Sequence, residues 1–306
     1  MSANTLEFGI GLSRPEDVAA NAREAESLGY DYVVTGEHVF FYGPINNGLI
    51  TLATAAGATQ RIKLMSTITL VPLYPAALLA KQVASLDVVS NGRFNLGVGV
   101  GGEFAREFEA CGVPVNERGA RTNESLELMQ RLFTEQDVTF EGRFSTLDKL
   151  TLDPRPVQTP LPTWISGRSA AAITRCAKYG TGWLPYMYTP QQLSDSVQAI
   201  ADQAMQHGRT DPIRSGLFIF FCVHEDHDTG VAMAAKRLSR QYNQDFSELV
   251  HKYAIAGSPE HCVARLQEYV EAGAQTVILN SACPSGYLET NEALMAQAVL
   301  PQLRQT

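Results

Sequence analysis

Several features of common protein classes are missing from this chain of 306 residues. Lysine and arginine total 24 against 32 aspartates and glutamates, and no basic cluster stands out, so we expect no nucleic-acid partner. The first residues do not place a basic region before an apolar stretch, which argues against a secretory leader. No apolar run approaches the ~20 residues that span a membrane, so we expect no membrane partner. These absences predict a cytoplasmic protein.

Cysteine is scarce, and its spacing is uninformative. There are five cysteines, an odd number, and no C-x-x-C pair. Neither a disulfide framework nor a zinc site is indicated, so we expect reduced thiols and no metal. The alternative is that one of them is a catalytic nucleophile.

Short β-branched runs alternate with longer segments of helical periodicity along the whole chain. This alternation is typical of parallel βαβ units. Eight such units close into a (β/α)₈ barrel of the α/β class, and we expect residues 1–306 to form one domain. The predicted strands are Leu6–Leu12, Tyr30–Gly36, Ile62–Leu70, Arg93–Val98, Thr163–Ser166, Gly182–Pro185, Leu217–Val223 and Thr276–Asn280.

Helix starts and stops support this pattern. Ser13 and Glu16 have the spacing of a capping box, and Gly29 would end the helix that the box opens. Thr189 and Gln192 form a second box with Pro190 between them, and Ser258 opens a helix that runs to Gly273.

Two stretches between strands exceed the usual loop length. One runs from residue 99 to 163, with a helix near 120–133, and the other from 224 to 257, with helices near 229–243 and 246–254. Both follow a strand, so both belong to the face where barrel enzymes build their active sites. We expect them to wall the substrate pocket.

Glu37 and His38 come directly after the second predicted strand. A histidine at the mouth of the barrel could donate or accept a proton near neutral pH. The alternative is a buried histidine that is hydrogen-bonded to the backbone. We predict that both residues are catalytic.

Ser166-Gly-Arg-Ser169 follows the fifth strand and opens a predicted helix over 170–179. Gly167 lets the backbone approach a ligand closely, and the free N–H groups of a helix start favour an anion. Arg168 and Ser169 add donors, so the segment predicts a phosphate site. Plain helix capping is the alternative.

A glycine-rich run, Gly97-Val-Gly-Val-Gly-Gly102, ends the fourth strand. It lies on the strand itself, so it is not the dinucleotide fingerprint, which needs a helix directly after its turn. Gly101 and Gly102 either bring the backbone close to a flat cofactor or form a tight turn. Further along, Arg121 could offer its guanidinium to a phosphate, although a solvated arginine is the alternative.

The order of these motifs resembles the bacterial luciferase-like monooxygenase superfamily over nearly the whole chain. The likeness is carried by Glu37-His38, Leu86-Asp87, Ser90–Phe94, Arg121 and Ser166–Ser169, with Asp153-Pro-Arg-Pro156 and Ala256–Glu260 in support.

The resemblance implies a (β/α)₈ barrel that binds reduced FMN or the deazaflavin coenzyme F-420. It makes His38 the active-site histidine, and it places the cofactor phosphate at Arg121, Gly167, Arg168 and Ser169. It also implies a non-proline cis peptide within Thr67-Ile68-Thr69, beside the cofactor. Two departures leave the cofactor open: Val100 stands where light-emitting members have arginine, and Glu103 follows Gly101-Gly102 close to a glutamate of deazaflavin-dependent members.

Two chemistries follow from the resemblance. The first is a monooxygenase that uses reduced FMN and O₂ on a small organic substrate, with a separate flavin reductase as partner. The alternative is hydride transfer by F-420 without oxygen, in which Glu103 or His38 is the proton partner. A flavin-binding barrel without catalysis is a third candidate. We expect a homo-oligomer with a small-molecule substrate and a pocket walled by aromatic residues after strands two and six: Phe40, Phe41, Tyr42, Tyr186 and Tyr188.

Overall fold

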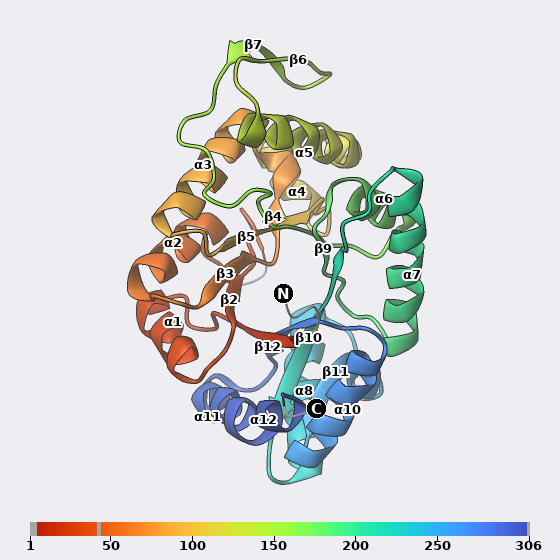
Figure 1. Cartoon of the computed structure of the whole chain (residues 1–306). Coiled ribbons are helices and arrows are strands. Elements are labelled where there is room, and N and C mark those ends of the chain that lie inside the picture. The colour runs from red at the N-terminus through yellow and green to blue at the C-terminus, as the bar shows by residue number, and fades with distance from the viewer. Residues whose placement is uncertain (1–4, 42–43, 305–306) are drawn as a thin grey trace.

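The computed structural model describes residues 5–41 and 44–304 and contains a closed barrel of parallel strands (Figure 1). Each strand pairs with the next around the ring, and pairing of β10 with both β9 and β12 closes it. The (β/α)₈ prediction is confirmed, and all eight predicted strands are present. In ring order they are β1 (Glu7–Gly11), β2 (Tyr32–Thr35), β3 (Lys63–Ser66), β5 (Phe94–Gly99), β8 (Thr163–Ile165), β9 (Gly182–Trp183), β10 (Arg214–Val223) and β12 (Thr276–Ser281).

Helices surround the strands and bury the strands' outer faces. The covering helices are α1 (Val18–Ser27), α2 (Gly48–Ala58), α3 (Ala76–Val89), α5 (Arg118–Thr134), α6 (Ala170–Tyr179), α7 (Pro190–Gln206), α10 (Pro259–Glu271), α11 (Leu288–Leu294) and α12 (Leu300–Leu303). Inside the barrel, Tyr32, Val34, Met65, Trp164, Leu184 and Ile278 form a packed apolar layer. This layer fills the barrel interior below its mouth, so we expect a ligand site at the C-terminal ends of the strands.

Two of the three predicted helix starts are confirmed. Thr189 and Gln192 make a reciprocal capping box on α7, and Ser258 caps α10. The box at Ser13 is wrong: Asp17 caps α1 through the N–H of Ala20, and the Ser13 hydroxyl donates to Glu292 instead. Aspartate is as good an N-cap as serine, so a cap four residues further on competes equally well.

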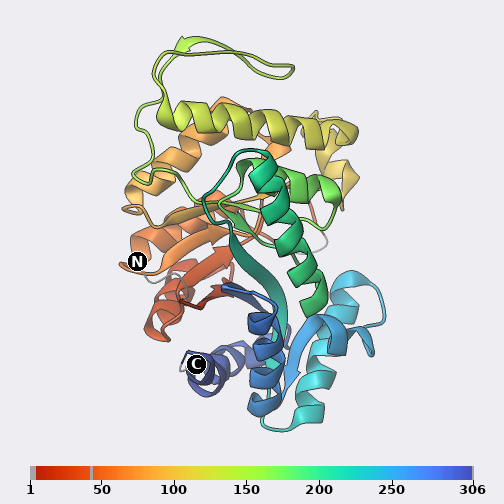
Figure 2. The ribbon, with the colours of Figure 1, turned by 45° about the vertical axis from the view of Figure 1, so that its right-hand side comes forward.

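The first long excursion lies only partly at the mouth. It contains α4 (Ala105–Ala110), α5 and an antiparallel hairpin of β6 (Val138–Glu141) and β7 (Thr146–Leu150). Figures 1 and 2 both show this hairpin beyond α5, away from the strands, where Glu124 accepts hydrogen bonds from the backbone of Arg143 and Phe144. The expectation that the whole excursion walls the pocket is therefore wrong for the hairpin.

The second excursion packs on one side of β10 (Figure 2). It contains α8 (His227–Tyr242), α9 (Leu249–Tyr253) and β11 (Ala254–Gly257), which pairs with the last four residues of β10. β11 is not among the predicted strands, and its first residue fell in a predicted helix, because a run of four residues is too short to show strand periodicity.

Two smaller elements complete the description. β4 (Thr69–Leu70) follows β3 and pairs with β5, and the peptide between Thr67 and Ile68, which separates β3 from β4, is cis, as the resemblance implied. Four of the five cysteines are buried, and all are free thiols. Within the described residues, no helix has the length and apolar character needed to cross a membrane.

Candidate active site

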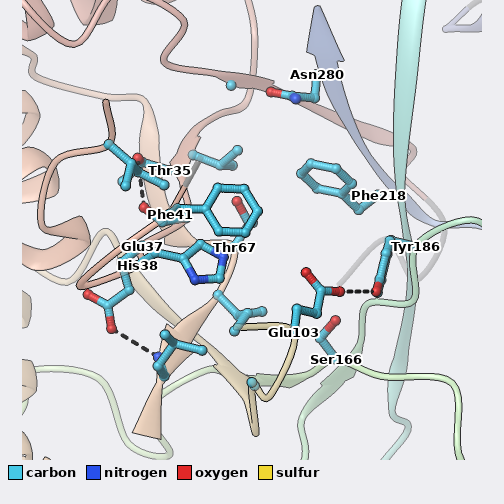
Figure 3. A pocket seen from close by; sticks show the side chains of 18 of the residues that line it. Thr35, Glu37, His38, Phe41, Thr67, Glu103, Ser166, Tyr186, Phe218 and Asn280 are labelled. Atoms are coloured by element: carbon cyan, nitrogen blue, oxygen red, sulfur yellow. Dashed lines mark hydrogen bonds between the residues drawn. The ribbon is translucent and has the colours of Figure 1, made fainter. Parts of the chain in front are cut away.

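A cavity of about 770 Å³ opens at the C-terminal ends of the strands. Residues from or directly after β1, β2, β5, β8, β9, β10 and β12 line it, so the chain contributes to it from nearly every side (Figure 3). Its size is typical of small-molecule and cofactor sites. Among the predicted site residues, it gathers His38, Glu37, Glu103, Thr67, Ile68, Gly101, Gly102, Gly167, Arg168, Ser169 and Tyr186.

His38 is held by a buried carboxylate. Its Nδ1 lies 3.1 Å from Oε1 of Glu107, a fully buried residue of α4 that also accepts the backbone N–H of Val39 at 3.1 Å. A carboxylate only accepts hydrogen bonds, so in the neutral imidazole the contact favours the proton on Nδ1 and leaves Nε2 as an acceptor. Phe41 stacks on the ring at 4.0 Å between centroids. The imidazole is thus fixed in both orientation and tautomer.

Glu37, which we predicted to be catalytic, is instead occupied by the protein. Its buried carboxylate accepts the backbone N–H groups of Leu70 and Gly48 at 2.9 and 3.3 Å and the Tyr74 hydroxyl at 2.9 Å. Burial raises the pKa of Glu37, and these hydrogen bonds partly oppose the rise. With its oxygens so engaged, Glu37 ties the loop after β2 to α2 and β4, and we interpret it as structural.

Glu103 projects into the cavity from the loop after β5 (Figure 3). Its Oε1 accepts the Tyr186 hydroxyl at 2.6 Å, and the Arg168 guanidinium lies 4.8 Å from the centroid of the Tyr186 ring. Burial first, and then the hydrogen bond to Glu103, raises the pKa of Tyr186 to about 12, so this phenol is neutral and a donor. The other carboxylate oxygen of Glu103, Oε2, has no hydrogen bond among the described residues.

One end of the cavity is built for an anion. Gly167, at a φ of 132°, turns the chain into α6, whose N-cap is Ser169. Ser169 caps the helix and also lines the cavity, so capping is confirmed and a role in phosphate binding stays a prediction. The helix start presents backbone N–H groups and the positive end of its dipole.

Two arginines that the sequence analysis missed reach the same end. Arg175 is buried on α6, donates to Asn123 at 2.7 Å, and has a pKa lowered by burial. Arg118, the first residue of α5, donates to the Val115 carbonyl and has a buried Nε without a partner among the described residues. Gly102, at a φ of 108°, makes room for this guanidinium, since a Cβ there would lie 2.9 Å from its Nε.

Arg121, predicted to bind phosphate, does not line the cavity. It pairs with Glu117 at 2.8 Å and stacks on Phe144 of the hairpin turn. Arg118 lies one helical turn earlier and faces the cavity, so the predicted helix is correct but the arginine is the wrong one. Residue spacing alone does not predict which face of a helix points into the cavity when that helix follows a long loop.

Three other predicted residues stay outside the cavity, and one is not described. Thr69 is buried beside the cis peptide, Phe40 is half exposed, and Tyr188 is buried with its carbonyl accepting the Tyr269 hydroxyl. Tyr42 lies outside the described residues. Of the five predicted aromatic residues, Phe41 and Tyr186 do line the cavity. Phe218 and Phe220 of β10 and Tyr242 of α8 complete the aromatic wall, and their rings meet edge to face. Phe218 and Phe220 alternate along a predicted strand, a signal that could have identified them.

Comparisons with known proteins agree with this architecture. Residues 3–276 match the family model described as luciferase-like monooxygenase. An uncharacterised protein of Mycobacterium tuberculosis is 30% identical over 184 residues, which are 60% of this chain and only 63% of that protein. An F420-dependent glucose-6-phosphate dehydrogenase of Amycolatopsis mediterranei is 24% identical across 99% of this chain and 97% of its own. A solved monooxygenase of Streptomyces bottropensis shares the fold at a TM-score of 0.84 and 24% identity, covering 97% of this chain and 100% of its own.

Proposed function

Since the chain belongs to the luciferase-like monooxygenase family, we propose that it is an oxidoreductase that binds the deazaflavin coenzyme F-420 and transfers a hydride without oxygen. In this proposal the cofactor's phosphate lies between Arg118, Arg175 and the start of α6, and its ring system lies toward His38. One observation carries the proposal. The same cavity holds arginines without an ion pair among the described residues, the oriented imidazole of His38, and a Glu103 oxygen without a hydrogen bond among those residues.

The residues at the cationic end fit a phosphate. None of the ion pairs among the described residues involves Arg118, Arg168 or Arg175. A buried cation without a counter-charge is costly, and so is a buried N–H without an acceptor. A phosphate would satisfy both, because guanidinium groups bind its oxygens with charge-assisted hydrogen bonds.

Glu103 favours the deazaflavin over FMN. It lines the cavity directly after Gly101-Gly102, near the position of the glutamate that the resemblance assigns to deazaflavin-dependent members. The Amycolatopsis relative, whose similarity spans almost the whole chain, supports the same choice. Our proposal therefore ranks F-420 above FMN, which is the reverse of the order that the sequence alone suggested.

When bound, the deazaflavin would accept or return a hydride, which is two electrons and one hydrogen nucleus. The protein has to manage the accompanying proton. Nε2 of His38 can take the proton that an alcohol hydroxyl loses as its carbon is oxidised, and can return it in the reverse direction. Glu107 stabilises the imidazolium that forms, because its buried carboxylate stays hydrogen-bonded to Nδ1.

Oxygen-dependent chemistry with reduced FMN is the second candidate. The observation in its favour is the wall of Phe218, Phe220 and Tyr242, since monooxygenation needs a site that excludes water. In that case a separate flavin reductase would supply the reduced cofactor.

A cofactor titration tests the proposal. F-420 and, under anaerobic conditions, reduced FMN are titrated into the protein while fluorescence is recorded, with Arg121→Ala as a control variant outside the cavity. We expect F-420 to bind at least tenfold more tightly than FMN. Tighter binding of FMN would favour the second candidate, and failure of both to bind would overturn the assignment of a cofactor cavity.

A further inference from the structure

The end of the cavity opposite the cationic residues has a different chemistry. In ring order, β12 lies four strands away from β5, which is the opposite side of an eight-stranded barrel. Arg118 and Glu103 follow β5, whereas Asn280 belongs to β12 and Phe218 to β10. In Figure 3, Asn280 lies at one edge of the cavity and Glu103 and Ser166 at the other, with Phe41 and Phe218 between them.

No lysine or arginine from the β1, β10 or β12 side is among the described residues that line the cavity. Arg14, which follows the cavity-lining Ser13, does not line the cavity itself and pairs with Glu24 and, at 2.7 Å, with Glu289. The carboxylate behind this wall is Glu292, which is buried and accepts the hydroxyl of the cavity-lining Ser13 at 2.8 Å. An anionic substrate would meet apolar rings and a neighbouring carboxylate there, and no cation.

Asn280 is the polar exception in this region. Its side chain lines the cavity, and its carboxamide makes no hydrogen bond within the described part of the chain. Gly11 provides the space it occupies, since a Cβ at residue 11 would lie 2.4 Å from its Oδ1. A carboxamide offers both donors and an acceptor, so it can bind a hydroxyl or a carbonyl group.

We propose that this end binds a neutral substrate with a hydrocarbon body and one hydroxyl or carbonyl group, a small alcohol, aldehyde or ketone, with Asn280 as its polar anchor. The aromatic wall covers the hydrocarbon part, and the single carboxamide orients the reactive group. This inference rests on the proposed function, since it takes the cationic end to be occupied by the cofactor. It sets the chain apart from relatives named for a phosphorylated sugar.

Ligand binding tests the proposal separately from cofactor binding. Saturation-transfer difference NMR is recorded on protein loaded with whichever cofactor the titration identifies, using cyclohexanone, cyclohexanecarboxylate and glucose 6-phosphate as probes. Cyclohexanone and cyclohexanecarboxylate share a ring and differ in charge. We expect cyclohexanone to bind at least tenfold more tightly than either anion. Equal or tighter binding of an anion would overturn the proposal, even where the cofactor binds as expected.

Variants at the anchor complete the test. Asn280→Leu should weaken cyclohexanone about 2- to 10-fold, the effect of one neutral hydrogen bond, while the dissociation constant of the cofactor stays within about twofold. Gly11→Ala should do the same by displacing the carboxamide, and it serves where Asn280→Leu fails to fold. Asn116→Leu, at an exposed position outside the cavity, is the matched control. Unchanged binding of cyclohexanone in both anchor variants would remove Asn280 from the site.

Discussion

The contact between Glu107 and His38 gives the sharpest prediction. Glu107→Gln keeps the shape of the side chain but replaces one accepting oxygen by a donating NH₂ group. The carboxylate now receives two donors, the imidazole Nδ1–H and the backbone N–H of Val39, each at 3.1 Å. An amide has one oxygen and cannot serve both sites, so the backbone donor should take it and the NH₂ group should face Nδ1. The imidazole then carries its proton on Nε2, which is the wrong nitrogen for accepting one from the substrate.

The expected cost follows from the role of the carboxylate. Removing a hydrogen-bond partner that orients a functional histidine typically lowers activity about 10- to 100-fold, and general acid–base catalysis as a whole contributes about 10²–10⁴-fold to the rate. We therefore expect turnover to fall between about 10-fold and 10²-fold, which is ~1.4 to 2.7 kcal/mol of barrier. Affinity for the cofactor should barely change, since Glu107 does not line the cavity.

Two measurements check this prediction. The ¹⁵N chemical shifts of the His38 ring report which nitrogen carries the proton, and turnover of the neutral probe with the bound cofactor gives the rate. Glu109→Gln, on the exposed face of the same helix, is the control and should change neither. If Glu107→Gln keeps both the tautomer and the rate of the parent protein, His38 is not held in the way we describe.

Four further outcomes are expected. Arg175→Ala should weaken cofactor binding about 10- to 100-fold in the fluorescence titration, whereas Arg121→Ala should leave it unchanged; equal effects would mean that the cationic end is misplaced. His38→Asn should lower turnover about 10²–10⁴-fold with little change in cofactor affinity, and a parallel loss of binding would make His38 a binding residue. Burial raises the pKa of Glu292, so its contribution to the free energy of unfolding falls as pH rises from about 4.5, the ordinary value, through the raised one. In urea unfolding, the free energy of unfolding of Glu292→Gln relative to the parent protein should therefore increase with pH in this window. A difference that does not depend on pH would contradict the raised pKa of Glu292. Limited proteolysis should cut first in the turn at 142–145 and leave the rest as one unit, since we propose a single domain; two resistant fragments of similar size would indicate two.

The barrel was predictable because its signals are local. Most strands are short apolar runs bounded by turn residues, and Thr189 and Ser258 each cap a helix that begins at the next residue. The predicted helix start at Ser13 was wrong because several nearby residues can cap a helix and packing selects among them. The hairpin of β6 and β7 was missed because its strands alternate only briefly and are largely exposed.

The site was predictable where a residue directly follows a strand and unpredictable elsewhere. His38, Glu103 and Ser169 come soon after strands, so the fold fixes where they lie. Glu107 meets His38 from 69 positions along the chain, inside a long excursion whose path depends on packing. Arg118 is a comparable case. It and Arg121 lie about one turn apart on the same helix, and the rotation of that helix about its axis decides which of them faces the cavity.

The long strand β10 has a consequence for how this protein can change over evolutionary time. Its first half closes the barrel, while its second half carries β11, α8 and much of the aromatic wall. The cationic residues come from a separate stretch, residues 118–175, on the other side of the ring. Mutation and selection can therefore remodel the second half of β10 and the segment that follows it, by altering its length or exchanging its aromatic side chains, without disturbing the groups that we propose hold the cofactor. A library confined to residues 218–242 and to Asn280 would sample new specificities on an unchanged redox scaffold.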